Sequence, residues 1–298
     1  MKELLSVVII TCNRHDCIIQ SIESCIAHSA RPLEFVIVDN ASTDNTKELL
    51  YEFFEGKENT TLNYTYLDKN TGVSYARNIG YQKATGDILF FIDDDAVVIS
   101  ETNSLDVVSD YMRKHDKVAA CMGKSIDPRY GGAMQMVRDK KDLNKDYYTV
   151  RSYIGFNHFI KKGFSSRDYL YPYNLFYGSE ELYVGLTVIA LGLKEVYIDS
   201  HIVEHHPSTQ TRIDPREGIK NGHINTYVIK SYFSPNIFSA VSYTLFLFRI
   251  LRFCRFNIRE VSNCLSLVNH RRDSQYSWKT STRRYVDAIQ RFGFFKIV

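Results

Sequence analysis

Hydrophobic positions along the first half of the chain follow two alternating periods. Residues 6–11, 34–39 and 88–92 are short, largely apolar runs rich in β-branched residues, which are typical of strands buried on both faces of a sheet. Segments after these runs, such as 72–84 and 104–115, carry apolar or small residues at helical spacing. Strands that alternate with helices in this way predict an α/β fold with a doubly wound, mostly parallel sheet.

The pattern loosens after about residue 123. Residues 124–150 are polar and include a Gly-Gly pair, so we expect a loop there. Apolar runs at 153–160, 196–198 and 201–203 predict further strands. A helix is expected to begin at the acidic pair 180–181 and to end near residue 191, where a glycine follows. The second half of the chain therefore continues the α/β pattern with longer irregular connections.

Polar side chains follow several of the predicted strands at the point where each strand ends. Residues 11–14 follow the first strand, Asp39 ends the second, and residues 93–95 are three consecutive aspartates after the run 88–92. Ligands of doubly wound sheets bind at the carboxyl ends of the strands. A single Asp after a strand is also an ordinary helix N-cap, but three adjacent carboxylates repel one another unless a cation compensates them. Such a cluster suits a hard cation such as Mg²⁺ or Mn²⁺.

Several other chemistries lack their motifs in this chain. No Gly-x-Gly-x-x-Gly follows the first strand, no phosphate-binding loop with its Gly-Lys-Ser/Thr exists, and no His-Glu-x-x-His is present. The six cysteines form no Cys-x-x-Cys pair, which disfavours a zinc ribbon or a redox motif. The first residues lack the apolar run of a signal peptide. We therefore expect a cytoplasmic protein with reduced thiols.

Positive charge is concentrated at the end of the chain. Residues 230–298 hold 12 Lys/Arg and 3 Asp/Glu, a balance of +9 within a chain whose net charge is +3. The uncharged run Ile237–Phe248 precedes Arg249, Arg252 and Arg255, but its 12 residues are too few to span a bilayer. The pattern fits a helix lying on an anionic membrane surface, a core helix with a basic rim, or a solvated basic face. Nucleic acid is not expected as a partner, because no nucleic-acid-binding motif accompanies the charge.

Four motifs occur in a fixed order in the first hundred residues. They are Thr11-Cys12-Asn13-Arg14, Val38-Asp39-Asn40-Ala41-Ser42-Thr43-Asp44, Asn70-Thr71-Gly72-Val73-Ser74-Tyr75-Ala76-Arg77-Asn78-Ile79-Gly80 and Phe91-Ile92-Asp93-Asp94-Asp95. Together they resemble the motifs of the family 2 glycosyltransferases, including enzymes of bacterial surface-polysaccharide synthesis. The resemblance implies the GT-A fold, a Rossmann-like α/β sheet, and inversion of the anomeric centre.

The resemblance implies a role for each matched residue. Glu181 would be the general base that takes the proton of the acceptor hydroxyl, with Glu180 as the alternative. Asp93 and Asp95 form an Asp-x-Asp motif and, with His205, are expected to hold a divalent metal, Mn²⁺ or Mg²⁺. The residues expected to contact a nucleoside-diphosphate-sugar donor, with a UDP-sugar favoured, are Thr11, Asn13, Arg14, Asp39, Asn70, Arg77, Asp93, Asp94 and Asn157. From the residues alone, the acidic pair also fits first-turn helix charges, and the histidine also fits a structural role.

The same resemblance organises the chain into two parts. Residues 1–229 are expected to form the GT-A catalytic domain, with a nucleotide-sugar-binding half at 1–100 and an acceptor-binding half at 101–229. Residues 230–298 are expected to form a basic, mainly helical C-terminal extension, with peripheral contact to the inner face of the cell membrane. The acceptor would be a carbohydrate or a lipid-linked carbohydrate. Two alternatives remain open, namely a catalytically inactive sugar-nucleotide-binding protein and a sugar nucleotidyltransferase.

Overall fold

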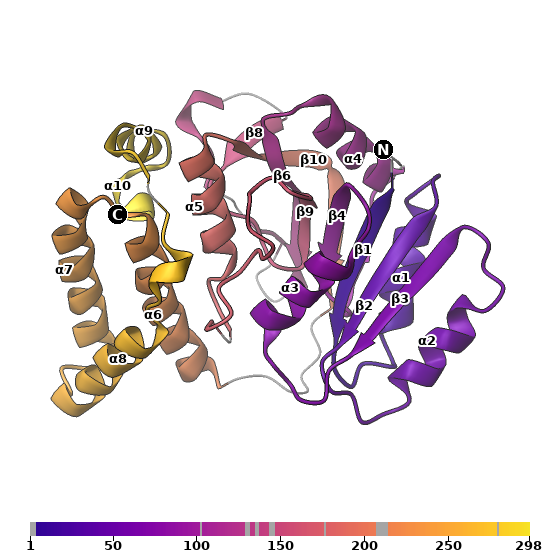
Figure 1. The fold of residues 1–298 in the computed structure, drawn as a ribbon, viewed down its shortest axis with the longest axis horizontal. Coiled ribbons are helices and arrows are strands. Elements are labelled where there is room, and N and C mark those ends of the chain that lie inside the picture. Colours follow the sequence, from indigo (N-terminus) through magenta and orange to yellow (C-terminus); the bar gives the residue numbers. More distant parts are fainter. Residues whose placement is uncertain are drawn as a thin grey trace.

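The apolar runs of the first hundred residues form buried parallel strands of one large sheet (Figure 1). The computed structural model describes residues 4–101, 103–128, 132–134, 137–142, 147–175, 177–206, 214–278 and 280–298. Strand β1 (Leu5–Thr11) pairs in parallel with both β2 (Leu33–Asp39) and β4 (Ile88–Ile92), and β2 pairs in parallel with β3 (Thr60–Tyr66). Because these strands are parallel, their carboxyl ends share one edge of the sheet.

The rest of the sheet is mixed. Within the described part of the chain, the strand order is β3-β2-β1-β4-β9-β6-β10-β5. Strand β9 (Asn157–Lys161) runs antiparallel between β4 and β6 (Val118–Asp127), whereas β6 and β10 (Lys194–His205) are parallel. The short strand β5 (Ala96–Val98) pairs antiparallel with the end of β10. The expected α/β fold with a mostly parallel sheet is confirmed, with one antiparallel strand at its centre.

The structure differs from two predictions that the sequence makes for the second half of the chain. The apolar runs 196–198 and 201–203 belong to one strand, β10, whose register shifts where the exposed Asp199 and Ser200 interrupt the apolar pattern. The expected loop 124–150 contains the end of β6 and the strands β7 (Gly132–Ala133) and β8 (Tyr147–Val150). Residues 129–131, 135–136 and 143–146 of that loop lie outside the described residues.

Helices cover both faces of the sheet, as a doubly wound fold requires. One core contains apolar side chains of α1 (Ile18–Ala27), α2 (Thr46–Phe54) and α4 (Ser104–Lys114) packed on one face. A second core contains side chains of α3 (Val73–Lys83) and α5 (Glu181–Leu191) on the other face. The largest side chains buried in these two cores include Phe35, Phe90, Phe91 and Phe159.

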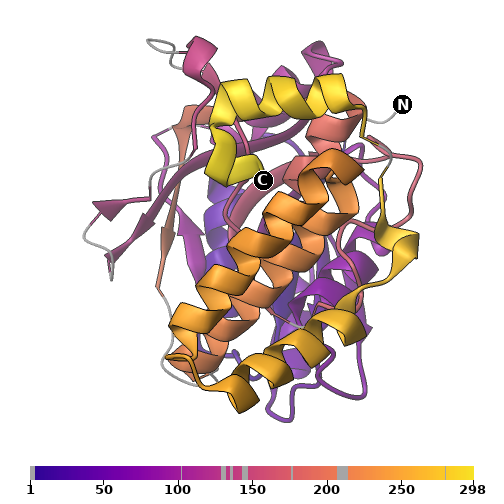
Figure 2. The ribbon, with the colours of Figure 1, turned by 90° about the vertical axis from the view of Figure 1, so that its left-hand side faces the viewer.

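The C-terminal region is helical and lies beyond α5 at one end of the molecule (Figure 1). Figure 2 looks onto this region, where α6 and α7 run side by side. Its apolar side chains form a third core with Leu182, Leu186 and Ala190 of α5. Its helices are α6 (Pro215–Phe233), α7 (Asn236–Phe253), α8 (Ile258–Arg271), α9 (Thr282–Phe292) and α10 (Phe294–Ile297), with a short 3-10 turn at Ser274–Tyr276. Another 3-10 turn, Lys140–Asp142, precedes β8.

The expected boundary between residues 229 and 230 falls inside α6, which begins at Pro215. The helical region therefore begins before residue 230, where the expected basic extension starts. Helix α7 ends at Phe253, and Arg255 follows it with a left-handed backbone, φ 49°. Arg255 therefore does not continue the helical face of Arg249 and Arg252. None of the helices in the described segments is both long and apolar enough to cross a membrane.

Candidate active site

The first two strand ends are fastened to each other by the loops that follow them. Thr11 and Asp39 are register partners at the ends of β1 and β2, and both are 1% exposed. The Asp39 Oδ1 atom accepts the N–H of Ser42 at 2.7 Å, and its Oδ2 atom accepts the Tyr64 hydroxyl at 2.6 Å. These bonds fix the Asp39 carboxylate at the strand edge, where each oxygen keeps a further lone pair for a ligand.

Asn13 joins the same two loops from the other side. Its backbone is left-handed (φ 56°), a conformation that Asn tolerates better than most residues. Its N–H donates to the Ser42 Oγ at 2.8 Å, and its Oδ1 accepts the N–H of Thr43 at 2.7 Å. Asn13 is thus a loop-shaping residue in this structure, and Arg14 beside it lies near the carboxylate of Asp94.

Asn70 belongs to a third loop at this edge. The Asn40 Nδ2 group donates to the Asn70 Oδ1 at 3.1 Å, and the N–H of Gly72 donates to the same oxygen at 3.0 Å. Gly72 has φ 80° and directly precedes α3, so the turn into α3 uses a backbone conformation that favours glycine. The loops after β1, β2 and β3 are therefore linked by hydrogen bonds that side chains make to main-chain groups and to one another.

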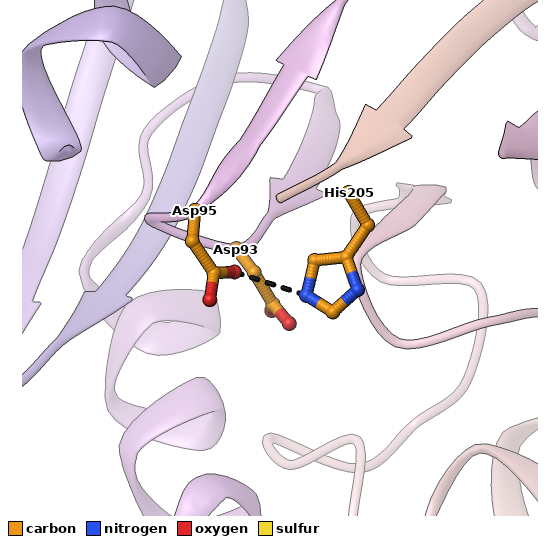
Figure 3. Close-up of side chains that lie close together, drawn as sticks. All are labelled: Asp93, Asp95 and His205. Carbon is orange, nitrogen blue, oxygen red and sulfur yellow. Dashed lines mark ion pairs between the residues drawn. The ribbon is translucent and has the colours of Figure 1, made fainter. Parts of the chain in front are cut away.

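Asp93, Asp95 and His205 come together from distant segments (Figure 3). The aspartates follow β4, and His205 ends β10 as the register partner of Ala96 in β5. This pairing brings the His205 Nε2 to 3.0 Å from the Asp95 Oδ1. One ligand atom from each of the three residues lies within 4.8 Å of the others.

A further carboxylate, Asp127 at the end of β6, orients the histidine. The His205 Nδ1 lies 3.1 Å from the Asp127 Oδ2, and its ring stacks on Phe156 at 4.5 Å. Burial acts to lower the pKa of His205, but its contacts with Asp95 and Asp127 outweigh burial and raise it. The sequence pattern does not mark Asp127 as a site residue, because it predicts a loop from residue 124 onwards, whereas β6 continues to Asp127. If the strand is extended to Asp127, this residue becomes a site candidate, because ligands of such sheets bind at the carboxyl ends of the strands.

Asp94 is buried between its two neighbours, with 8% of its surface exposed. Burial, followed by the charges of Asp95 and Asp93, raises the pKa of Asp94 to about 8. The three consecutive aspartates are therefore not equivalent. Asp93 and Asp95 face His205, whereas Asp94 is buried and its charged form is disfavoured.

Arg77 of α3 connects this cluster to the acidic pair of α5. It is 4% exposed, and its guanidinium lies 3.0 Å from the Asp93 Oδ1, 3.2 Å from the Glu180 Oε1 and 3.9 Å from the Glu181 Oε1. It also donates to the Gly155 carbonyl at 3.1 Å. One buried cation thus compensates three carboxylates from two segments of the chain.

Glu181 is the first residue of α5 and Glu180 is its N-cap position. Gly178 and Ser179 approach the helix with φ 92° and 66°, a sharp turn that presents the pair towards Arg77. Burial and the neighbouring Glu180 raise the pKa of Glu181, whereas Arg77 opposes the rise. A Cβ atom at Gly155 would come within 2.6 Å of the Glu181 Oε1, so the glycine permits this close approach.

Asn157 begins β9 beside β4, as the register partner of Ile92. It is fully buried, and its Nδ2 donates to the Ser125 Oγ at 3.1 Å, while its Oδ1 has no hydrogen-bond partner. The expected site residues therefore all lie at or near one edge of the sheet. A hollow of about 410 Å³ lies at the amino ends of β6 and β10, where Tyr147 and Lys194 line it. It contains none of the expected site residues.

Comparison with known proteins identifies the class to which this fold and site belong. A model described as glycosyl transferase family 2 matches residues 6–167, more than half of the chain. The chain therefore belongs to the glycosyl transferase family 2.

Two curated relatives align with parts of the chain. An uncharacterized glycosyltransferase of Haemophilus influenzae is 26% identical over 147 residues, which are 49% of this chain and 56% of the relative. The putative teichuronic acid biosynthesis glycosyltransferase TuaG of Bacillus subtilis is 33% identical over 94 residues, 32% of this chain and 36% of the relative. The chain therefore aligns with between about a third and a little over half of the length of these relatives.

Solved structures share the fold over most of the chain. S. aureus TarS 1–349 in complex with UDP-GlcNAc superposes with a TM-score of 0.61 at 16% identity, covering 91% of this chain and 82% of that one. The mannosyltransferase PcManGT from Pyrobaculum calidifontis, in complex with GDP-Man and Mn²⁺, has a TM-score of 0.60 at 16% identity and covers 91% and 76%. At these identities the likeness establishes the GT-A fold.

Proposed function

We propose that the chain is a metal-dependent, inverting glycosyltransferase that moves a sugar from a nucleoside-diphosphate-sugar donor to an acceptor hydroxyl. The observation that carries this proposal is the arrangement around Arg77. A possible metal-holding cluster lies on one side of the guanidinium, and an acidic pair lies on the other. A glycosyl transfer needs both parts in one site, because the leaving diphosphate requires positive charge and the attacking hydroxyl requires a base.

The residues present fit a divalent metal. Asp93 and Asp95 offer carboxylate oxygens and His205 offers an imidazole nitrogen, a set suited to Mn²⁺ or Mg²⁺. Asp127 holds the second nitrogen of the imidazole, as the outer partner of a metal-bound histidine usually does. A metal bound here would supply Lewis-acid stabilisation of the donor's diphosphate. The donors in the superposed structures, UDP-GlcNAc and GDP-Man, support a nucleotide sugar, and we take UDP as the carrier to test first.

A side chain of the protein accepts the proton that the acceptor hydroxyl loses during transfer. We assign Glu181 as the group that accepts the proton of the acceptor hydroxyl, because it is the first residue of α5 and lines a pocket of about 290 Å³. The acceptor oxygen then bonds to the anomeric carbon as the bond from that carbon to the diphosphate oxygen breaks. Attack from the opposite face inverts the anomeric centre. The raised pKa of Glu181 strengthens it as a base near neutral pH.

Glu180 has a different task in this scheme. It is 4% exposed, and its Oε1 is held by Arg77. A carboxylate that is buried and paired in this way positions the arginine rather than meeting a substrate. The assignment favours Glu181 over Glu180 as the base.

For the donor, we propose that the strand-end residues keep the roles that the family resemblance implies, whereas the roles of Asn13 and Asn70 change. Thr11, Asp39 and Arg14 would face the nucleoside and diphosphate from the ends of β1 and β2. Asn13 and Asn70 would act through the loops that they hold. We propose polysaccharide or glycoconjugate synthesis as the setting, supported by the name of the Bacillus subtilis relative.

We also propose that the helical region touches an anionic membrane surface. Side chains exposed on and beside α7 include Ile237, Phe248 and Phe256, which are 73%, 65% and 72% exposed. Arg252 and Arg255 are exposed beside them. Each basic residue near an anionic surface adds about 1 kcal/mol of attraction. Co-sedimentation with anionic but not neutral vesicles, lost in Arg252→Glu with Arg255→Glu, is the expected result, and indifference to both vesicle types contradicts it.

The experiment that tests the proposed activity is incubation of the protein with a panel of UDP-sugars and Mn²⁺, followed by measurement of released UDP with and without candidate acceptors. Release that depends on the metal and increases with an acceptor is expected. Binding of nucleotide without any release, across the donor panel, would leave a sugar-nucleotide-binding protein instead.

A further inference from the structure

A pocket of about 290 Å³ opens beside Glu181, between α5, α6, α7 and α10. Its walls carry the hydroxyls of Ser179 and Thr226 as well as the Glu181 carboxylate. Positive charge dominates the remaining polar groups, which come from four separate segments of the chain. These cations are Arg151, Lys230, Arg249 and Lys296. We call this hollow the basic pocket.

In the segments that the structure describes, side-chain carboxylates do not form ion pairs with any of these four cations. Lys230 is only 5% exposed, and its ammonium donates to the main-chain oxygens of Phe295 and Val298 at 3.2 and 2.9 Å. The Arg151 Nε is buried without a hydrogen-bond partner, and the acidic group that acts on this arginine is Glu195 of β10.

The crowding has a measurable consequence for Lys230. Burial, and then the charges of Arg151, Arg249 and Lys296, lower the pKa of Lys230 to about 7. Arg249 and Lys296 are exposed to solvent, whereas Lys230 is buried. Like charges gathered around one pocket repel one another, and an ion of opposite charge bound among them relieves this repulsion. Arginine and lysine together are the usual ligands of phosphate, arginine through its planar fork and lysine as a point charge.

We propose that the basic pocket binds a phosphate group of the acceptor, next to the hydroxyl that Glu181 deprotonates. This inference rests on the proposed function, since it takes Glu181 as the base. The donor's own diphosphate is not the expected occupant, because Asp93, Asp95 and His205 do not line this pocket. The acceptor would thus be a phosphate-bearing alcohol or sugar, either soluble or attached to a lipid. Its anion would fix the position of the hydroxyl relative to Glu181.

The first test is titration of inorganic phosphate, at constant ionic strength, into three proteins by calorimetry. They are the wild type, the double variant Arg249→Ala with Lys296→Ala, and the control Arg259→Ala with Arg283→Ala. The control makes the same change in charge at exposed positions that do not line the basic pocket. Loss of two phosphate contacts is expected to weaken binding by about tenfold or more in the double variant and not in the control. Equal affinities in all three proteins, or no binding by the wild type, would overturn the proposal.

The same samples are titrated with UDP and Mn²⁺, which separates this inference from the proposed function. Unchanged UDP binding in the double variant shows that it is folded and that only the acceptor side is affected. Phosphate binding without any UDP binding in the wild type would refute the donor site instead. If the double variant does not fold, Arg249→Ala alone replaces it, with the same direction of effect expected.

Vesicles identify the source of the phosphate. Phosphatidic acid in phosphatidylcholine presents a lipid phosphate, and sn-glycerol 3-phosphate presents the same group in solution. A lipid-attached acceptor predicts that the double variant loses affinity for the phosphatidic acid vesicles as well as for glycerol phosphate. A soluble acceptor predicts loss only for glycerol phosphate. Retention of both affinities contradicts the basic pocket as a phosphate site.

Discussion

The two sides of Arg77 differ in the sign of the charge that gathers there. On the side of the strand ends, Asp93, Asp94 and Asp95 crowd together, and burial with this crowding raises the pKa of Asp94 to about 8. On the side of the helices, the basic pocket gathers four cations, and burial with their charges lowers the pKa of Lys230 to about 7. Carboxylates therefore gather on the strand-end side, and cations gather on the helix side.

This difference explains which ligand each side is expected to take. A cluster of carboxylates with an oriented histidine favours a divalent cation. A cluster of arginines and lysines favours a phosphate. Arg77 and the acidic pair lie between the two, so a donor held through a metal and an acceptor held through its phosphate would meet at Glu181.

The largest expected effect is the loss of transfer activity on substitution of Glu181, which lies between the two sides. Glu181→Gln is expected to lower transfer by roughly 10² to 10⁴, the usual contribution of a general base, while UDP binding is retained. The measurement is the rate of acceptor-dependent UDP release. Glu180→Gln is the matched control, and we expect it to retain more activity because Glu180 pairs with Arg77. A larger loss in Glu180→Gln than in Glu181→Gln would assign the base to Glu180.

Arg77 is expected to stabilise the folded protein, because it pairs with carboxylates of the strand-end side and of α5. Arg77→Met removes the buried cation shared by Asp93, Glu180 and Glu181. Breaking a buried ion pair by removing one partner costs about 3–5 kcal/mol, because the other charges are left buried without compensation. Urea denaturation at neutral pH measures this loss. A change of less than about 1 kcal/mol, the usual value for an exposed pair, would mean that Arg77 does not compensate the carboxylates in solution.

A smaller effect is expected on the pH dependence of the free energy of unfolding, and it tests Lys230 in the basic pocket. Lys230 has a lowered pKa in the folded protein, about 7, against about 10.4 in an unfolded chain. Between these values the unfolded chain binds more protons, so this group makes the free energy of unfolding increase with pH from about 7 to 10. Lys230→Met is expected to reduce that increase in urea denaturation at pH 7 and pH 9. An identical increase in both proteins would show that Lys230 titrates normally.

How far the sequence predicts the molecule also differs between the two sides. The parallel strands β1, β2 and β4 and the aspartates that follow β4 are predictable, because buried strands and their polar ends are local patterns. The contact between His205 and Asp95 follows from pairing of β10 with β5, which no local pattern reveals. Short strands such as β5 carry too few residues to display a period.

The basic side is the less predictable one. The sequence shows an excess of positive charge in residues 230–298, but Arg151 of the basic pocket lies outside that segment. The even spacing of Arg249, Arg252 and Arg255 suggests one helical face, whereas the structure ends α7 at Phe253 and places Arg249 in the pocket wall. Tertiary packing of α5 through α10 decides which cations meet, and a charge count along the chain does not contain that information.

The central claim is that Asp93, Asp95 and His205 hold a divalent cation for a nucleoside diphosphate, and calorimetric titration of UDP with and without Mn²⁺ tests it most directly. Asp95→Asn and the exposed control Asp116→Asn are compared with the wild type. The wild type and the control are expected to bind UDP at least about tenfold more tightly with Mn²⁺, a gain of about 1.4 kcal/mol, and Asp95→Asn is expected to show no such gain. UDP binding by the wild type that is equally tight without Mn²⁺, or an Asp95→Asn protein that keeps the full gain, would contradict the account.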